Sequence, residues 1–203
     1  MKKIITYFLI LFVSFATAYS LSKDKLYKDI SKIFNEVGSI ELEFANTQGI
    51  GGTIKAEKNN KYCLELPGRT VVSDGENVWN YSHNNETVLI SKFDKHSSQI
   101  SIEKIFFDYL NKSNPEKLEK VTNSEGLKRY KLTLDPPDTD NKLSLEKIYL
   151  WLDTDSRDLK AISYKNDIQT FKWFIISLKT NLKTDSGTFS PSYPDDAEVI
   201  DLR

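Results

Sequence analysis

The spacing of apolar residues changes along the chain and predicts which segments form helices and which form strands. Over residues 22–38 apolar residues recur every three or four positions, with Ser22 and Asp24 suited to a helix start and Gly38 to a helix end. This segment is predicted to be an amphipathic helix, and its apolar face carries Leu26, Ile30, Ile33, Phe34 and Val37.

From Ile40 to Phe93 the apolar residues recur at every second position, which is typical of β-strands. Turn-forming pairs, among them Asn59-Asn60, Pro67-Gly68 and Asp74-Gly75, divide this stretch into about six short strands. Because the turns are so close together, consecutive strands are expected to be antiparallel neighbours.

A second helical pattern then interrupts the strands. It sets Ile102, Ile105 and Phe106 on one helical face, and a short further helix is expected over 115–121, opened by Pro115. Strand patterns resume over 127–136, 143–153, 158–167 and 168–180. The stretch 170–178 is apolar or aromatic on both faces, so we expect a strand that is covered on both sides.

This order of elements predicts a mainly β protein. About ten antiparallel strands with few helices favour a single curved antiparallel sheet, with amphipathic helices covering its concave face. The periodicity leaves open whether the space between helices and sheet is packed solid or holds an apolar cavity.

The N-terminal residues have the layout of a secretory signal peptide. Lys2 and Lys3 precede an apolar run over 4–13, and Ala16-Thr17-Ala18 matches the small-x-small pattern of a cleavage site. We therefore expect a signal peptide over 1–18 and one mature domain over 19–203, with no composition shift or linker to divide it.

Charge and cysteine content narrow the possible functions. Without Lys2 and Lys3 the chain has 26 basic and 29 acidic residues, which alternate along its length, so the basic face of a nucleic-acid-binding protein is not expected. The single cysteine, Cys63, cannot form an internal disulfide, and its strand neighbours predict a structural role. No pattern indicates a homodimer, and a monomer is expected.

Candidate catalytic residues do not form a recognisable constellation. Ser73, Asp74 and His83 lie close in sequence, but Ser73 precedes an Asp-Gly turn and lacks the strand-to-helix elbow of a hydrolase nucleophile. His83, His96 and Cys63 have no zinc-ligand spacing, and the loop with Asp138 and Asp140 has too few ligands for calcium. We expect no enzyme activity, no metal and no cofactor, and a secreted hydrolase is the least favoured alternative.

The segment 66–93 contains Ser73-Asp74-Gly75 followed by Trp79 and Tyr81, and it resembles the central signature of the periplasmic outer-membrane lipoprotein carrier family (LolA-type). The order of elements is also similar over nearly all of the mature chain. The resemblance implies an unclosed β-barrel of about ten to eleven strands, whose helices cover an apolar cavity for the acyl chains of lipoproteins.

The resemblance also implies roles for residues and partners. The expected cavity lining combines apolar residues two apart on neighbouring strands: Tyr62, Leu64, Leu66, Trp79, Tyr81, Val88 and Ile90. The expected lid helices carry Leu26, Ile30, Ile33, Ile102, Ile105 and Phe106. The family pattern has an Arg-Pro pair that latches the lid, and here Lys58-Asn59 stands in that place, so Lys58 is the candidate latch.

The implied function is a periplasmic carrier that moves lipoproteins from the inner to the outer membrane. Its implied partners are acylated lipoproteins, an inner-membrane lipoprotein-releasing ABC transporter and an outer-membrane acceptor lipoprotein. The alternative is a binding module of the same fold for another amphiphile or for an envelope protein.

Overall fold

The structure is a computed structural model that describes residues 21–94, 102–122, 126–137, 145–185 and 187–203. The signal peptide expected over 1–18, together with His96, Asp138 and Asp140, lies outside these residues. Within them, no helix is both long enough and apolar enough to cross a membrane.

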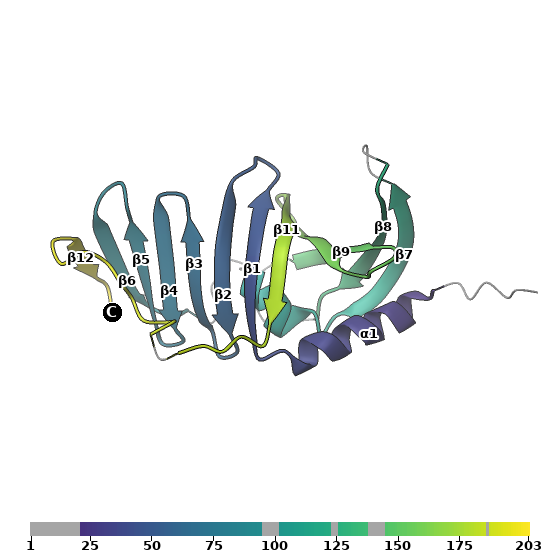
Figure 1. Cartoon of the computed structure of the whole chain (residues 1–203), viewed down its shortest axis with the longest axis horizontal. Coiled ribbons are helices and arrows are strands. Elements are labelled where there is room, and N and C mark those ends of the chain that lie inside the picture. Colours follow the sequence, from purple (N-terminus) through teal and green to yellow (C-terminus); the bar gives the residue numbers. More distant parts are fainter. Residues whose placement is uncertain (1–20, 95–101, 123–125, 138–144, 186) are drawn as a thin grey trace, which may run out of the picture.

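Twelve strands form one unclosed, curved sheet in the order β12-β6-β5-β4-β3-β2-β1-β11-β10-β9-β8-β7 (Figure 1). The strands are β1 (Ser39–Asn46), β2 (Gly51–Glu57), β3 (Lys61–Leu66), β4 (Arg69–Asp74), β5 (Asn77–Ser82), β6 (Thr87–Lys92), β7 (Asn114–Thr122), β8 (Lys128–Asp135), β9 (Leu145–Asp153), β10 (Leu159–Asn166), β11 (Thr170–Thr180) and β12 (Glu198–Asp201).

The predicted fold class is confirmed, with two corrections of detail. The described strands number twelve, more than the ten to eleven expected, because the segment after the π-helix η1 (Ile105–Tyr109) adds β7 at one edge and the tail after β11 adds β12 at the other. The sheet is also not wholly antiparallel, since β12 runs parallel to β6, with Val199 opposite Val88. A parallel pair needs a long connection, and the chain between β6 and β12 contains α2 (Ile102–Lys104), η1 and β7–β11.

Two helical regions cover one face of the sheet, which we call the inner face. The first is α1 (Lys23–Glu36), whose start is capped by Ser22 Oγ accepting from the backbone N–H of Lys25 over 3.2 Å. The second joins α2 (Ile102–Lys104) to the π-helix η1 (Ile105–Tyr109), and it confirms the interrupting helix predicted there. The helix expected at Pro115 is wrong.

The segment 114–122 is the edge strand β7. Seven residues are too few for a stable helix of their own, whereas pairing with β8 gives the segment a hydrogen-bonded partner along its length. Pro115 is tolerated there because an edge strand leaves some N–H groups unpaired, and the register shifts between Pro115 and Lys117.

The main hydrophobic core lies between the inner face and the helices. Leu42, Ile54, Leu132 and Leu150 project into it from four strands, and none is exposed above 1 %. Phe106 of η1 is fully buried among them. At about 25 cal/mol per Å² of apolar surface, this core supplies most of the burial that stabilises the fold.

The opposite, outer face is covered only in part. The C-terminal segment, residues 181–185 and 187–203, runs from the end of β11 across β4 to β12 (Figure 1). Thr184 donates a hydrogen bond to the carboxylate of Glu57, and the ring of Tyr193 lies 6.4 Å from that of Tyr81. This C-terminal segment therefore covers a second, smaller core on the outer face of β4–β6.

Candidate functional site

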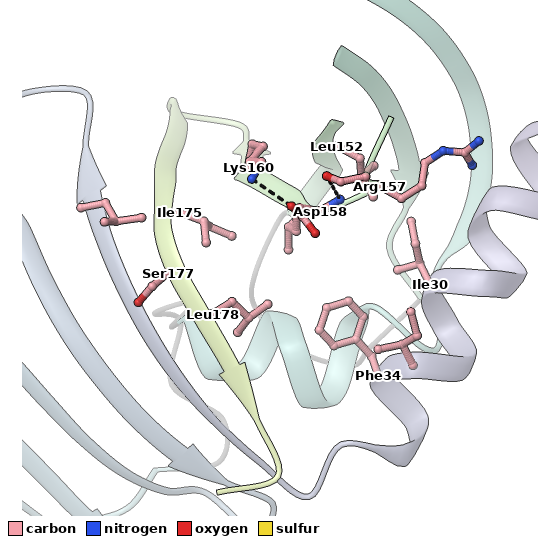
Figure 2. Close-up of a pocket in the computed structure, with 13 residues that line it drawn as sticks. Ile30, Phe34, Leu152, Arg157, Asp158, Lys160, Ile175, Ser177 and Leu178 are labelled. Carbon is pink, nitrogen blue, oxygen red and sulfur yellow. Dashed lines mark hydrogen bonds and ion pairs between the residues drawn. The ribbon is translucent and has the colours of Figure 1, made fainter. Parts of the chain in front are cut away.

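A groove lies between α1 and the sheet, on the side of β9, β10 and β11 (Figure 2). It has a volume of about 540 Å³, within the range of about 300–1,000 Å³ that is usual for small-molecule pockets. Its apolar lining comes from α1 and three strands and consists of Ile30, Ile33, Phe34, Leu152, Leu159, Ile175, Ile176 and Leu178.

Helix α1 forms one wall of the groove because its apolar residues follow the helical period. Leu26, Ile30 and Phe34 lie one turn apart and are buried, and the ring of Phe34 meets that of Phe106 edge to face at 5.1 Å. Ile33 also lines the groove, yet 57 % of its surface is exposed. It therefore lies at the open side, where a bound apolar group would cover it.

Strand β11 forms the facing wall, and a β-bulge sets its shape. Phe44 of β1 pairs with Ile175 and Glu43 pairs with Ser177, so Ile176 is an extra residue without a partner on β1. Bulges re-aim side chains. As a result Ile175 and Ile176, which are consecutive, both line the groove, and Ile176 stays 61 % exposed.

The turn between β9 and β10 supplies a polar rim. Asp153 Oδ1 accepts hydrogen bonds from the backbone N–H groups of Asp155 and Ser156, and these bonds, with the nearby charge of Arg129, hold the pKa of Asp153 below its usual value. Arg157 adopts a positive φ of 65° in this turn.

Both charge signs are present at the rim. The guanidinium of Arg157 stacks over Tyr130 at 5.4 Å, while Asp158 and Lys160 form an ion pair at 3.1 Å. The two cations and one carboxylate leave this rim with a single excess positive charge, next to an apolar interior. This arrangement suits an amphiphile with an anionic or polar head, and it offers no nucleophile with a base beside it.

The candidate latch, Lys58, lies at the end of α1. Its ammonium donates to the backbone carbonyl of Asn35 over 3.2 Å, and its backbone N–H donates to the carbonyl of Gly38 over 3.3 Å. The last turn of α1 contains no basic residue of its own. Lys58 therefore supplies from β2–β3 the positive charge that a helix C-terminus favours. Its role in lid movement stays a prediction.

The other residues expected in the lid helices occupy different positions. Ile30 and Ile33 line the groove, whereas Leu26, Ile105 and Phe106 are buried in the main core. The side chain of Ile102 lies outside what the structure describes.

The residues expected to line one cavity lie on two faces, so that expectation is wrong. Tyr62, Leu64 and Leu66 of β3 are on the inner face, half-buried against the main core, but none of them lines the groove. Burial, with the charge of Glu103 nearby, raises the pKa of Tyr62. Their part in lipid binding stays a prediction.

The remaining four residues, Trp79, Tyr81, Val88 and Ile90, are on the outer face. Antiparallel residues that pair directly share a face, and the register aligns Trp79 with Val72 on one side and Ile90 on the other. Val72 in turn pairs with Cys63, the neighbour of Leu64. Val88 and Ile90 are at most 5 % exposed, beneath the C-terminal segment.

The polar residues 73–83 have structural partners. Asp74 Oδ1 accepts from the backbone N–H groups of Glu76 at 2.8 Å and Asn77 at 2.7 Å, and these bonds close the β4–β5 turn around Gly75, whose φ is +97°. Ser73 Oγ accepts from the N–H of Gly75, and the imidazole of His83 bonds to Thr70 Oγ1 at 2.9 Å. Burial raises the pKa of the Cys63 thiol.

The lining contributed by β9–β11 was not expected from the sequence. The bulge leaves no local signal, because the residues around Ile176 read as an uninterrupted apolar strand. The one available signal was the pair of adjacent isoleucines, 175 and 176, which cannot share a face in a regular strand.

Residues 42–192 match the family model described as "Outer membrane lipoprotein carrier protein LolA". No curated protein matches the chain.

Several solved structures are similar. An uncharacterized conserved protein from Thermus thermophilus is 15 % identical with a TM-score of 0.52, over 89 % of this chain and 99 % of that one, which shows a shared fold. A putative outer membrane lipoprotein-sorting protein domain from Vibrio parahaemolyticus is 13 % identical with a TM-score of 0.44, over 83 % and 97 %. A LolA superfamily protein from Nitrosomonas europaea is 9 % identical with a TM-score of 0.39, over 83 % and 98 %.

Proposed function

Because the chain belongs to the LolA family of outer membrane lipoprotein carrier proteins, we propose that it carries lipoproteins between the inner and outer membranes, with their acyl chains in the groove beside α1. On this proposal, the signal peptide expected over 1–18 directs the protein to the periplasm. An inner-membrane lipoprotein-releasing ABC transporter loads it, and an outer-membrane acceptor lipoprotein receives the cargo.

The observation that carries the proposal is the open, apolar groove with exposed isoleucines on both walls. Ile33 on α1 and Ile176 on β11 face water over more than half of their surface, which is costly unless a ligand covers them. An acyl chain gains about 0.8 kcal/mol for each CH₂ that leaves water, so a groove of this size holds it strongly.

The polar rim supports the same class of ligand. An acylated lipoprotein has apolar chains joined to a polar peptide, and the groove has an apolar interior next to Arg157, Asp158 and Lys160. No bond of the cargo has to break during carriage, so the site needs shape and burial rather than catalytic groups.

Uptake of a diacylated lipopeptide, measured by native mass spectrometry on the purified protein, tests the proposal. We expect one lipopeptide per chain in the wild type and at least tenfold weaker binding in Ile33→Asp, because a carboxylate at the groove wall opposes entry of an acyl chain. Ile33 is exposed, so its substitution leaves the core intact.

The matched control is Lys25→Glu, which places a carboxylate on an exposed position of α1 away from the groove. It should bind the lipopeptide as the wild type does. Unchanged binding by a folded Ile33→Asp variant would exclude the groove as the acyl site. Uptake of a single-chain detergent or a protein segment without any uptake of lipopeptide would favour the alternative, a binding module for another amphiphile or an envelope protein.

A further inference from the structure

Two lysines and three aromatic residues gather on the outer face of β8–β11. We call residues that pair directly across neighbouring strands a row. In one row, Lys131 of β8 is opposite Trp151 of β9, and Phe174 of β11 follows on the far side of β10. The next row brings together Tyr149 and Lys172. We call these five residues the lysine–aromatic cluster.

The cluster is a preformed surface, because its long side chains cover small residues. Ala161 and Ser163 lie in its two rows, on the same face, and are only 3 % and 1 % exposed. The hydroxyl of Ser163 has no hydrogen-bond partner among the described residues. An unpartnered polar atom thus lies at the floor of the cluster, next to Lys172 in the register.

Both ammonium groups stack on the aromatic rings. Lys172 Nζ lies 4.3 Å from the ring centre of Trp151 and 4.8 Å from that of Phe174. Lys131 Nζ lies 4.6 Å from the ring centre of Tyr149 and 5.7 Å from that of Trp151. The two cations therefore share one indole, which holds their charges close together.

Neither ammonium forms an ion pair in the described part of the chain. Other lysines of the sheet are paired: Lys165 with Glu146, and Lys179 with Glu41. Glu119 is opposite Lys131 in the register but forms its ion pair with Lys117 at 2.9 Å. The bond to Lys117, and to a smaller extent the charge of Lys131, lower the pKa of Glu119. Burial, and the charge of Lys131, lower the pKa of Lys172, as expected for two cations that lack an anion between them.

Exposed apolar residues continue the surface along β11. Phe174 is 43 % exposed, and Ile168, in the turn before β11, is 82 % exposed. The strand was expected to be covered on both sides, and that expectation is wrong for its outer side. The C-terminal segment lies over β4–β6 instead (Figure 1).

We propose that the lysine–aromatic cluster docks the protein on a membrane surface that contains anionic phospholipid. Aromatic rings with lysines and a few exposed apolar side chains are the combination that places a protein at the headgroup layer. The two unpaired ammoniums match the lipid phosphates in charge. Lysine on its flexible stem suits a diffuse anionic layer, whereas directional recognition of carboxylates in an acidic protein favours arginine.

Flotation of the purified protein with vesicles tests this inference. The vesicles contain phosphatidylcholine alone or phosphatidylcholine mixed with phosphatidylglycerol. We expect binding only to the mixed vesicles, and a loss of affinity of about thirtyfold in Lys131→Gln/Lys172→Gln, since each lysine near an anionic surface contributes about fivefold. The control, Lys55→Gln/Lys179→Gln, removes two charges that both pair with Glu41 of β1, away from the cluster, and it should retain most of the affinity.

Tryptophan fluorescence gives an independent measurement. A blue shift on adding mixed vesicles should disappear in Trp151→Phe. Equal binding by both double variants would overturn the proposal, because the contact would then follow net charge alone. Binding to polyglutamate with no binding to mixed vesicles would also overturn it and would assign the cluster to an acidic protein. Lipopeptide uptake should be unaffected in every cluster variant, so this test is separate from that of the groove.

Discussion

The ammonium of Lys58 donates a hydrogen bond to the backbone carbonyl of Asn35, with 3.2 Å between the two atoms. The bond joins the β2–β3 turn to the last turn of α1, one wall of the groove. It is exposed to water and is made by a flexible point charge, so its strength is at the low end of charge-assisted hydrogen bonds.

The first prediction concerns Lys58→Arg. A guanidinium can bond two carbonyls at a helix end and hold α1 closed more firmly, which favours discharge of cargo from the groove. We expect faster transfer of a fluorescent lipopeptide to acceptor vesicles, by up to about tenfold if one bond of about 1.5 kcal/mol is added. Lys58→Ala should change transfer little. If Lys58→Ala changed the transfer rate strongly and Lys58→Arg did not change it, the lysine would already hold α1 as firmly as an arginine, and this prediction would be wrong.

The second prediction concerns Asn59, the residue after Lys58. Asn59 has a φ of +69°, and Asn60 has a φ of +62°, so the β2–β3 turn requires two left-handed residues. Proline fixes φ near −65°, and we expect Asn59→Pro to lower the free energy of unfolding by about 3 kcal/mol or more in urea denaturation.

Asn59→Gly is the control, because glycine adopts positive φ without strain, and it should change stability by less than about 1 kcal/mol. Equal stability of the two variants would show that the turn is not left-handed. Because Asn59 has a positive φ, which proline cannot adopt, the Arg-Pro pair of the family pattern does not fit this turn in its present conformation.

The third prediction concerns Trp79, which is on the outer face, two residues from Tyr81, whose ring lies 6.4 Å from that of Tyr193 in the C-terminal segment. Trp79→Glu should loosen that segment and lower stability, because the second core loses an aromatic side chain and gains a charge. Limited proteolysis followed by mass spectrometry should show faster cleavage within residues 187–203. Lipopeptide uptake should stay unchanged, and its loss in a folded variant would return Trp79 to the acyl site.

The fourth prediction concerns pH. The pKa of Asp153 is lowered below its ordinary value of 3.8 by hydrogen bonds from Asp155 and Ser156. A carboxylate with a lowered folded pKa stabilises the fold above its unfolded pKa, and this contribution is lost as the pH falls through the folded value. In Asp153→Ala the melting temperature should therefore depend less on pH below 3.8 than in the wild type.

Periodicity was enough to predict α1 and the strands that became β1–β6, because each segment repeats one spacing over several residues. It failed at 115–121, where Leu118 and Val121 are three apart and fit a helix as well as a strand. Pairing with β8 decides the outcome there. That contact is between segments, so no local spacing reports it.

Alternation also showed which residues of one strand share a face, but not how faces match between strands. The two-residue turn at Pro67-Gly68 places Leu66 opposite Arg69, which brings Leu64 opposite Val71 and leaves Val72 on the other side. Pairing the residues on either side of this turn, and then across β4 and β5, places Leu64 and Trp79 on opposite faces of the sheet. The groove required more, since it depends on a bulge and on where α1 packs.

The change of buried face between β3 and β4 divides the molecule into two compartments. The main core and the groove belong to the part of the sheet that runs from β3 through β1 and β11 to β7. Strands β4–β6 and the C-terminal segment form a wing with a hydrophobic interior of its own. A substitution inside the wing should alter the stability of the wing and leave the volume of the groove unchanged. The stability of the wing and the volume of the groove can therefore change independently, although both belong to one continuous sheet.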